Sequence, residues 1–267
     1  MTDDKTGQVR SVTRALTLLR TLANSANGMS LSETALAAGL AASTAHRILT
    51  TLESEHFVRF DQTDNLWRIG VDAFTTGAAF LRTRDVIGLT RPYLRRLMEQ
   101  TGETANVFLE TGGEVICMEQ VESRHSMRSI TRVGGKARMH CSGAGKAMLA
   151  FMTDEAKDKI LSLHGLPRET SNTITDRAAL ECTLRQVRAR GFAVDDGENS
   201  EGTRCVAAPV LNETGLPAAA ISVSGPAARI DDAKLSHLGA IISDIAGEVT
   251  RSFGGCDPRQ VALAANS

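Results

Sequence analysis

Residues 30–70 read SLSETALAAGLAASTAHRILTTLESEHFVRFDQTDNLWRIG, and this stretch decides the fold of the first part of the chain. It opens as a capping box, in which the Ser30 hydroxyl accepts from the third helical amide and Glu33 reaches back to the start of the helix. This pattern predicts a short helix through Ala38. Gly39 then supplies a tight turn, so a second helix must follow at a sharp angle.

The helix after the turn has two contrasting faces, and Ser43 is placed to cap it. Its inner face is apolar and carries Ala45, Ile48, Leu49 and Leu52. Its outer face carries short polar groups and one arginine, namely Ser43, Thr44, His46, Arg47, Thr50 and Thr51. A recognition helix presents such groups to base edges and phosphates, and we expect Arg47 to make the specific base contact. The alternative is a merely solvated face with His46 at the surface.

A helix precedes this pair and a hairpin follows it. Apolar residues at helical spacing predict a helix over residues 11–24 with one buried face: Val12, Ala15, Leu16, Leu18, Leu19 and Leu22. After the pair, Phe57–Phe60 and Leu66–Ile69 alternate as two strands around a polar turn. Arg59 and Arg68 lie on the polar side of these strands, where they could contact phosphates or the minor groove, and Trp67 is expected to fill the core. Three helices and a hairpin predict a winged helix-turn-helix.

A small-residue helix is predicted next, over residues 71–84, with one apolar stripe formed by Val71, Phe74, Ala78 and Leu81. Such a helix can pack on the preceding winged helix-turn-helix of its own chain, here called the head, or pair with a second copy of the chain. We expect dimerisation, because a palindromic operator requires two-fold symmetry.

The remaining sequence changes to strand hairpins and segregated helices. A helix is expected from Val86 to Gly102 with one apolar face: Val86, Leu89, Tyr93, Leu94, Leu97 and Met98. Strands are expected at Thr104–Glu110, Glu114–Val121, Ser126–Val133, Phe192–Asp195, Arg204–Leu211 and Ala218–Ser224. Further helices are expected near Lys146–Met152, Asp154–Leu163, Arg177–Arg190 and Ala233–Phe253. This order predicts an α+β domain with an antiparallel sheet.

Polar groups interrupt this domain at two places. The loop His140-Cys-Ser-Gly-Ala-Gly-Lys146 is not a phosphate loop, because position 140 is not glycine and Ala147 stands where a magnesium-binding hydroxyl is needed. It still leads into a helix N-terminus that favours a small anion. Ser222 and Ser224 lie on one face of their strand, and a ligand, backbone carbonyls or buried water could satisfy them. Asp195 could accept from a ligand hydroxyl.

Composition limits the other possibilities. The 267 residues carry 30 Lys+Arg and 31 Asp+Glu, so the overall charge gives no indication of nucleic-acid binding. The N-terminal MTDDKTGQVR lacks the features of a secretory signal, and no run of about eighteen apolar residues could span a bilayer, so we expect a cytoplasmic protein with no membrane partner. Five cysteines without a C-x-x-C pair argue against disulfides and a thiolate zinc site. Neither a cofactor nor a metal is expected.

Taken together, the head, the small-residue helix, the Gly-Glu-Thr-Ala-Asn run at 102–106, the Cys-Ser-Gly-Ala-Gly-Lys loop and the Ile-Ser-Val-Ser-Gly-Pro strand resemble the IclR family of bacterial transcriptional regulators. The similarity covers about residues 9 to 254. The branch of allantoin and glyoxylate regulators is the most similar, on Trp67-Arg-Ile-Gly70, Gly77-Ala-Ala-Phe80, Arg84-Asp-Val86, Arg95-Arg-Leu-Met98, Ser142-Gly-Ala-Gly-Lys146 and Ala219-Ala-Ile-Ser222. The resemblance implies a winged-helix head, a dimerising linker helix and a GAF-like effector domain, assembled as a dimer of dimers on DNA.

The resemblance also implies an effector site. In the glyoxylate branch the ligand is held by residues that correspond to Gly143, Ala144, Asp195, Cys205, Ser222 and Ser224. Thr203 and Arg204 depart from the residues expected before that cysteine, which leaves open a different small 2-oxo acid.

We therefore expect a ligand-responsive regulator that binds operator DNA and a small carboxylate effector. The expected domains are 8–70 for DNA binding, 71–85 for the linker helix, 86–254 for the effector domain and 255–267 for a flexible tail. One rival is an enzyme with Cys205 or Cys141 as nucleophile and His140 as base. Another is a C-terminal domain that only assembles the protein and binds no ligand.

Overall fold

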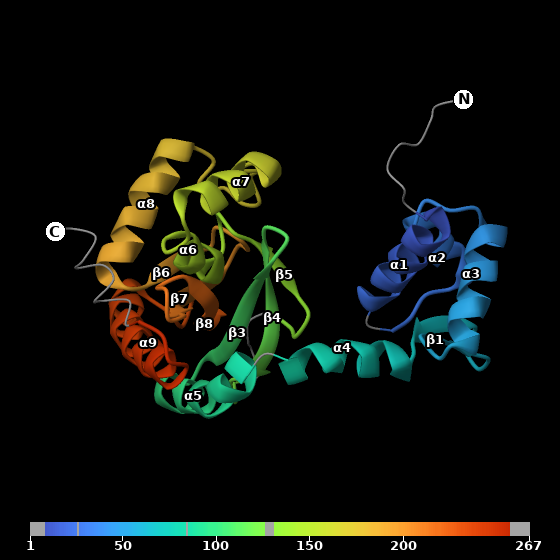
Figure 1. The fold of residues 1–267 in the computed structure, drawn as a ribbon, viewed down its shortest axis with the longest axis horizontal. Helices are drawn as coiled ribbons and strands as arrows, with labels where there is room; N and C mark the ends of the chain where they lie inside the picture. The colour runs from blue at the N-terminus through green and yellow to red at the C-terminus, as the bar shows by residue number, and fades with distance from the viewer. Residues whose placement is uncertain (1–8, 26, 84, 126–130, 257–267) are drawn as a thin grey trace. The chain divides into compact units, whose positions relative to one another are not determined.

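The computed structural model describes residues 9–25, 27–83, 85–125 and 131–256, and contacts divide the chain into two units, Met1–Arg84 and Asp85–Ser267 (Figure 1). None of the helices within these ranges is long and apolar enough to cross a membrane.

The first unit is built from four helices and a two-stranded hairpin within its described residues. They are α1 (Arg10–Ala23), α2 (Leu31–Ala37), α3 (Ala42–Ser54), β1 (Val58–Asp61), β2 (Leu66–Ile69) and α4 (Val71–Thr83). The predicted capping box is confirmed, since the Ser30 side chain accepts from the backbone of Glu33 and the Glu33 carboxylate accepts from the Ser30 amide. Gly39 has φ +64°, a backbone conformation that favours glycine, and it makes the turn between α2 and α3.

The core of the head is small and apolar, and it includes Leu18, Leu22, Ala45, Leu49 and Trp67. Trp67 is 4% exposed and packs against Phe60, so its predicted role in the core is confirmed.

Two predictions for the head are wrong. Ser43 does not cap α3, because the N-cap lies two residues earlier, at Ala41, which makes no side-chain capping bond. Val12 and Leu16 do not face the core: they are 55% and 46% exposed, because the α2–α3 pair covers only part of the apolar surface of α1.

The second unit contains an antiparallel sheet of six strands in the order β5-β4-β3-β8-β7-β6, and the predicted α+β fold is confirmed. The strands are β3 (Thr104–Thr111), β4 (Glu114–Val121), β5 (Lys136–Arg138), β6 (Ala193–Asp196), β7 (Thr203–Leu211) and β8 (Pro217–Pro226). The helices are α5 (Asp85–Thr101), α6 (Gly143–Leu149), α7 (Asp154–His164), α8 (Arg177–Arg190) and α9 (Asp232–Ser252).

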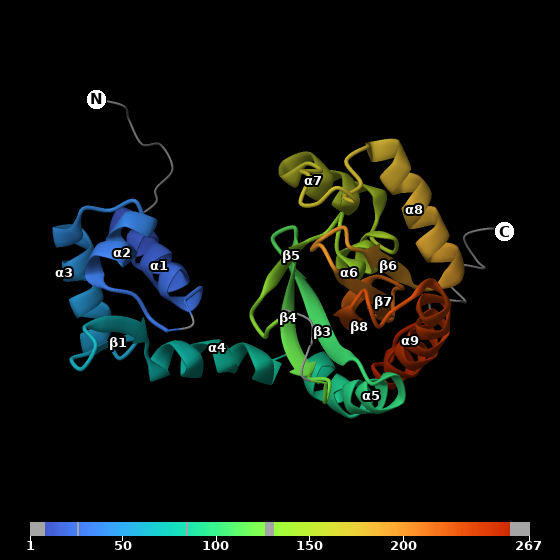
Figure 2. The same ribbon diagram turned by 180° about the vertical axis from the view of Figure 1, so that it is seen from behind.

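The sheet separates two apolar cores. Helices α5 and α9 lie along one side of the sheet, and α6, α7 and α8 lie toward the other side (Figures 1 and 2). Leu94 of α5 and Ile242 of α9 belong to the first core, whereas Met148 of α6 and Leu180 of α8 belong to the second. The second core is interrupted by polar side chains where β6, β7 and β8 run beside the start of α6.

The strand predicted at Ser126–Val133 is wrong where it can be compared. Residues 131–133 form no strand, and residues 126–130 lie outside the described ranges. The strand that pairs with β4 is β5, further along the chain, and the turn at Gly134 and Gly135 bonds to Cys117 of β4 instead. The predicted tail at 255–267 lies outside the described residues from position 257 onward.

Candidate functional site

Helix α3 presents a polar, solvent-facing surface. Ser43, His46, Arg47 and Thr50 are exposed and Thr44 is half-buried, while Ala45 and Leu49 on the opposite side are fully buried. The Arg47 guanidinium has no carboxylate partner in the parts of the chain that the structure describes, so its five donors face solvent. An arginine without a carboxylate partner, next to short hydroxyl side chains, can hydrogen-bond to base edges in a major groove.

The two wing arginines differ in their availability. Arg59 is 61% exposed and lies 3.7 Å from Asp61. Arg68 is bound by two carboxylates: its Nη1 lies 3.0 Å from Asp61, and its Nη2 forms a close ion pair with Asp64. Arg68 therefore stiffens the hairpin, and of the two arginines Arg59 has the freer charge for a phosphate.

A row of polar side chains crosses the sheet on the α6 side. Strand register places Asp195 opposite Cys205 and Cys205 opposite Ser224, while Ser222 lies opposite Asn106. Residues directly opposite on neighbouring strands share a face. Four of the six predicted effector residues therefore share one face of the sheet. Asn106 joins them, although it was not predicted as a site residue.

Asn106 fixes the orientation of the two serine hydroxyls. Its Nδ2 donates to Ser222 Oγ at 3.1 Å and to Ser224 Oγ at 3.2 Å, while its Oδ1 accepts from Gln120 Nε2 at 3.0 Å. Gln120 is held in turn by the Thr131 carbonyl oxygen at 2.7 Å. Because both serine oxygens already accept from Asn106, each hydroxyl can donate its hydrogen, and that of Ser222 is also in hydrogen-bonding contact with the Cys205 thiol.

The glycine loop brings backbone close to this row. Ser142 caps α6 by accepting from the Gly145 amide at 3.1 Å. A Cβ atom at Gly145 would lie 2.3 Å from the Met139 carbonyl oxygen, and one at Gly143 would lie 3.1 Å from Cys205 Sγ. Gly143 therefore allows the start of α6 to approach β7 beside Cys205, and Ala144 follows it in α6. Gly145 allows α6 to pass close to the backbone of Met139.

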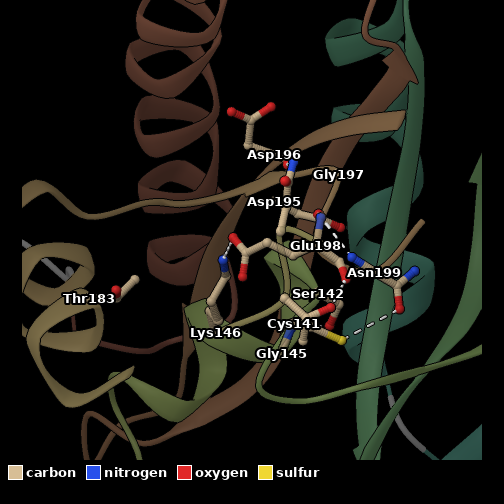
Figure 3. Close-up of polar contacts among 12 residues, drawn as sticks. Cys141, Ser142, Gly145, Lys146, Thr183, Asp195, Asp196, Gly197, Glu198 and Asn199 are labelled. Atoms are coloured by element: carbon tan, nitrogen blue, oxygen red, sulfur yellow. Dashed lines mark hydrogen bonds and ion pairs between the residues drawn. The ribbon is translucent and has the colours of Figure 1, made fainter. Parts of the chain in front are cut away.

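A buried group of charges completes the site (Figure 3). Asp195 Oδ1 accepts from the backbone amides of Glu198 at 2.7 Å and Asn199 at 3.3 Å. Lys146, 1% exposed, forms a close ion pair with Glu198 Oε1. Burial raises the pKa of Asp195 to about 7, an effect that the Lys146 charge partly offsets, and burial also raises the pKa of Glu198. Lys146 and Glu198 were not predicted as site residues; a lysine ending the glycine loop was the available signal.

The thiols of this region are protonated near neutral pH. Burial raises the pKa values of Cys141 and Cys205 to about 12. His140 Nε2 lies 3.0 Å from the Pro167 carbonyl oxygen, and burial lowers the pKa of His140. A thiolate–imidazolium pair for nucleophilic catalysis is therefore not formed here.

A thiol titration tests this assignment. Near pH 7 we expect an aromatic disulfide reagent to react fast with the two exposed cysteines, Cys182 and Cys256, and slowly with Cys117, Cys141 and Cys205. Unfolding in denaturant should release the slow thiols. Fast reaction of Cys141 or Cys205 in the folded protein would revive the nucleophile hypothesis.

Thr203 and Arg204, which depart from the glyoxylate branch, line a different hollow. A cleft of about 450 Å³ is lined by these two residues together with Asn172, Asp196, Gly197, Gly202, Ala227, Asp231 and Asp232. Arg204 pairs there with Asp196 at 2.5 Å and with Asp232 at 2.8 Å. None of the six predicted effector residues lines this cleft.

Comparison with known proteins places these features together in one family. Residues 11–62 match the IclR helix-turn-helix domain, and residues 78–251 match the bacterial transcriptional regulator IclR C-terminal domain. The chain is 43% identical over 252 residues to the transcriptional repressor IclR of Escherichia coli (strain K12), covering 94% of this chain and 92% of that protein. It is 33% identical over 245 residues to the HTH-type transcriptional repressor AllR of the same strain, covering 92% and 90%.

A solved structure agrees with both matches. The crystal structure of Thermotoga maritima IclR superimposes with a TM-score of 0.75 at 28% identity, covering 92% of this chain and 100% of that one. The relatives are regulators and not enzymes, in keeping with the protonated thiols. This chain thus combines helix α3 and its exposed arginine, a hairpin wing and an antiparallel domain with a buried polar row. It belongs to the IclR family of bacterial transcriptional regulators.

Proposed function

We propose that the chain is a ligand-switched regulator whose effector is a small 2-oxo acid, with glyoxylate as the first candidate. The observation that carries this proposal is the orientation of Ser222 and Ser224, whose oxygens accept from Asn106. Each hydroxyl can then donate to a ligand, which for Ser222 would replace its contact with the weakly accepting Cys205 thiol. Two donating hydroxyls, both buried, are adapted to the oxygens of a carboxylate. Gly143 and Ala144 would add backbone amides, and Cys205 would form the floor.

The other end of a glyoxylate molecule would face Asp195. Asp195 uses Oδ1 for two backbone amides, so its second oxygen is the one available to the hydroxyl of an aldehyde hydrate. The site would thus recognise a carboxylate and a neighbouring polar carbon, which are the two groups of a short 2-oxo acid. A different small carboxylate is the alternative within this proposal.

The head would read the operator through α3. We assign the specific base contact to Arg47 and phosphate contacts to Arg59, with Arg68 supporting the wing. Contacts to the DNA backbone, or secondary contacts to bases, are assigned to Ser43, Thr44, His46 and Thr50. The ligand would act through its differential affinity for two subunit arrangements that space the paired heads differently.

Pairing of heads is assigned to the linker helix. Val71 and Phe74 of α4 are 68% and 73% exposed, an unusual amount for two large apolar residues on one stripe. A second copy of the chain covering this stripe would remove it from water and give the two-fold symmetry of a palindromic operator. A dimer of dimers and a GAF-like effector domain complete the proposal on the strength of the family resemblance.

A charge on the stripe tests the pairing. We expect Phe74→Asp to shift the protein toward smaller species in sedimentation at micromolar concentration and to lower operator affinity in parallel, because a buried carboxylate opposes association. Leu36→Asp is the matched control, since Leu36 is 85% exposed on α2 of the same unit. Unchanged sedimentation of Phe74→Asp would move the interface elsewhere.

The effector is tested by thermal unfolding of the full-length protein with millimolar glyoxylate, pyruvate, oxamate and acetate. A ligand that binds only the folded state raises the Tm by mass action, and at a hundredfold excess over Kd this is worth about 2.7 kcal/mol. We expect glyoxylate to give the largest rise. A flat response to every acid would favour a C-terminal domain that only assembles the protein.

A further inference from the structure

The buried charges beside the polar row do not balance. Lys146 is 1% exposed, Asp195 is 5% exposed and the side chain of Glu198 is 10% exposed. The Lys146 ammonium pairs with Glu198 Oε1, whereas Glu198 Oε2 is buried and has no hydrogen-bond partner within the described ranges. One cation therefore serves two buried carboxylates.

The chain holds both carboxylates in place. Asp195 lies near the end of β6 and Glu198 in the turn that follows. The backbone carbonyl oxygens of this segment accept from side chains of residues 170–173: Asn172 Nδ2 donates to Asp196 O at 2.9 Å, Thr170 Oγ1 to Gly197 O at 2.7 Å and Thr173 Oγ1 to Glu198 O at 2.7 Å. The amides of the same turn bind Asp195. The turn backbone is therefore fixed, the Asp195 carboxylate cannot turn away without losing two amide bonds, and the Glu198 carboxylate cannot turn away without leaving Lys146 unpaired.

The groups that face Asp195 are few. Lys146 faces it from α6, Glu198 from its own turn, Cys205 from β7 and Cys141 from the loop before α6. The two thiols are neutral near pH 7 for the reason given above. The neighbouring Asp196 points away from the cluster in Figure 3 and pairs with Arg204, although its charge still helps to raise the pKa of Glu198.

We propose that this site binds a monocarboxylate effector together with one proton, which Asp195 holds, because Lys146 offsets the charge of only one of the two buried carboxylates. The inference rests on the proposed function, since it takes the polar row as the effector site. A third negative charge next to Asp195 and Glu198 would meet repulsion in a poorly solvated place, and protonation of Asp195 relieves it. With the proton on its second oxygen, the neutral carboxyl donates to an oxygen of the ligand, whereas the ionised carboxylate would accept from the hydroxyl of a hydrate.

The free protein is poised for this uptake, because the pKa of Asp195 is raised to about 7 by burial. Above that pH each binding event must bring a proton from solution. Effector affinity should therefore fall by roughly tenfold per pH unit between about pH 7 and 9, although glyoxylate itself stays anionic throughout.

Calorimetry of glyoxylate binding at pH 8, in two buffers of different ionisation enthalpy, measures the proton directly. We expect uptake of close to one proton by the unaltered chain and by the control Asp196→Asn. Asp195→Asn keeps an oxygen to accept from the turn amides and resembles the protonated acid, so we expect no uptake and a pH-independent Kd. Buffer-independent enthalpy and a flat pH profile for the unaltered chain would overturn the proposal.

Glu198→Gln distinguishes charge balance from simple structural support. Removing one negative charge leaves Lys146 to offset Asp195, so we expect tighter binding at pH 8, by several-fold, and less proton uptake. If Glu198 only supports the fold, the variant binds more weakly at every pH, which contradicts the proposal.

Failure of the effector itself can be recognised separately. If glyoxylate does not bind even at pH 6, the proposed effector is wrong. The pH dependence of the Tm without ligand then tests whether Asp195 takes up the proton. Its folded-state pKa lies above the unfolded value, so its favourable contribution is complete below about pH 4 and is lost as pH rises through about 7. The Tm of Asp195→Asn relative to the unaltered chain should climb over this interval; a constant difference would overturn Asp195 as the proton acceptor.

Discussion

Replacing Arg47 with alanine is expected to weaken operator binding by roughly tenfold to a hundredfold. A good bidentate contact to a base is worth about 1–3 kcal/mol of discrimination, and Arg47 is the exposed α3 side chain with the geometry for it. The loss should be confined to operator DNA, because base contacts add little to non-specific binding. Fluorescence anisotropy with operator and scrambled duplexes at one salt concentration measures both.

Two controls sharpen this prediction. Arg59→Ala should weaken binding to operator and scrambled DNA alike and reduce the salt slope by about one, as expected for a lost phosphate contact. Glyoxylate affinity of Arg47→Ala should match that of the unaltered chain, because the proposed effector residues belong to the other unit. Equal operator affinity in Arg47→Ala would remove Arg47 from the readout.

The second large effect is expected in the effector domain. Ser222→Ala or Ser224→Ala should each weaken glyoxylate binding by roughly tenfold to a hundredfold, since a hydrogen bond to a charged group contributes about 1.5–3 kcal/mol. The fold should survive, because Asn106 Nδ2 retains the other serine as acceptor in each single variant. Calorimetric titration with glyoxylate gives the Kd values.

The controls for this prediction separate the ligand from the fold. Ser236→Ala removes a hydroxyl from α9 that bonds only weakly to the Asp232 carbonyl oxygen, at 3.4 Å, and should leave glyoxylate binding unchanged. Operator affinity without ligand should be the same in all three variants. Glyoxylate binding at the original affinity in both Ser222→Ala and Ser224→Ala would show that the pocket is assigned to the wrong place.

The sequence predicts well those features that local interactions determine. Helix α8 has the predicted bounds, Arg177–Arg190, because Asp176 caps it and Gly191 ends it with φ +82°. The capping box of α2 and the turn at Gly39 are also determined within a few residues. The prediction that Ser43 caps α3 was wrong, because a residue with extended backbone can precede a helix without a side-chain capping bond. Ala41 takes that position here.

Features that depend on distant parts of the chain were harder to predict. Alternation showed that Ser222 and Ser224 share a face, but their partner Asn106 is more than a hundred residues away and follows only from the β3–β8 register. Lys146 and Glu198 are 52 residues apart, and no local pattern joins them. Arg68 could have been recognised as an ion-pair partner of Asp64, since the two lie four residues apart in one hairpin.

The central claim is that a small 2-oxo acid changes how this regulator binds DNA, and an electrophoretic shift tests it most directly. The promoter DNA next to the protein's own gene is incubated with the full-length chain at fixed salt, with and without millimolar glyoxylate, since salt sets the electrostatic part of the affinity. We predict a specific complex whose apparent Kd changes at least several-fold with glyoxylate. An identical Kd in both conditions would contradict glyoxylate as the effector, and absence of a specific complex would contradict the operator assignment.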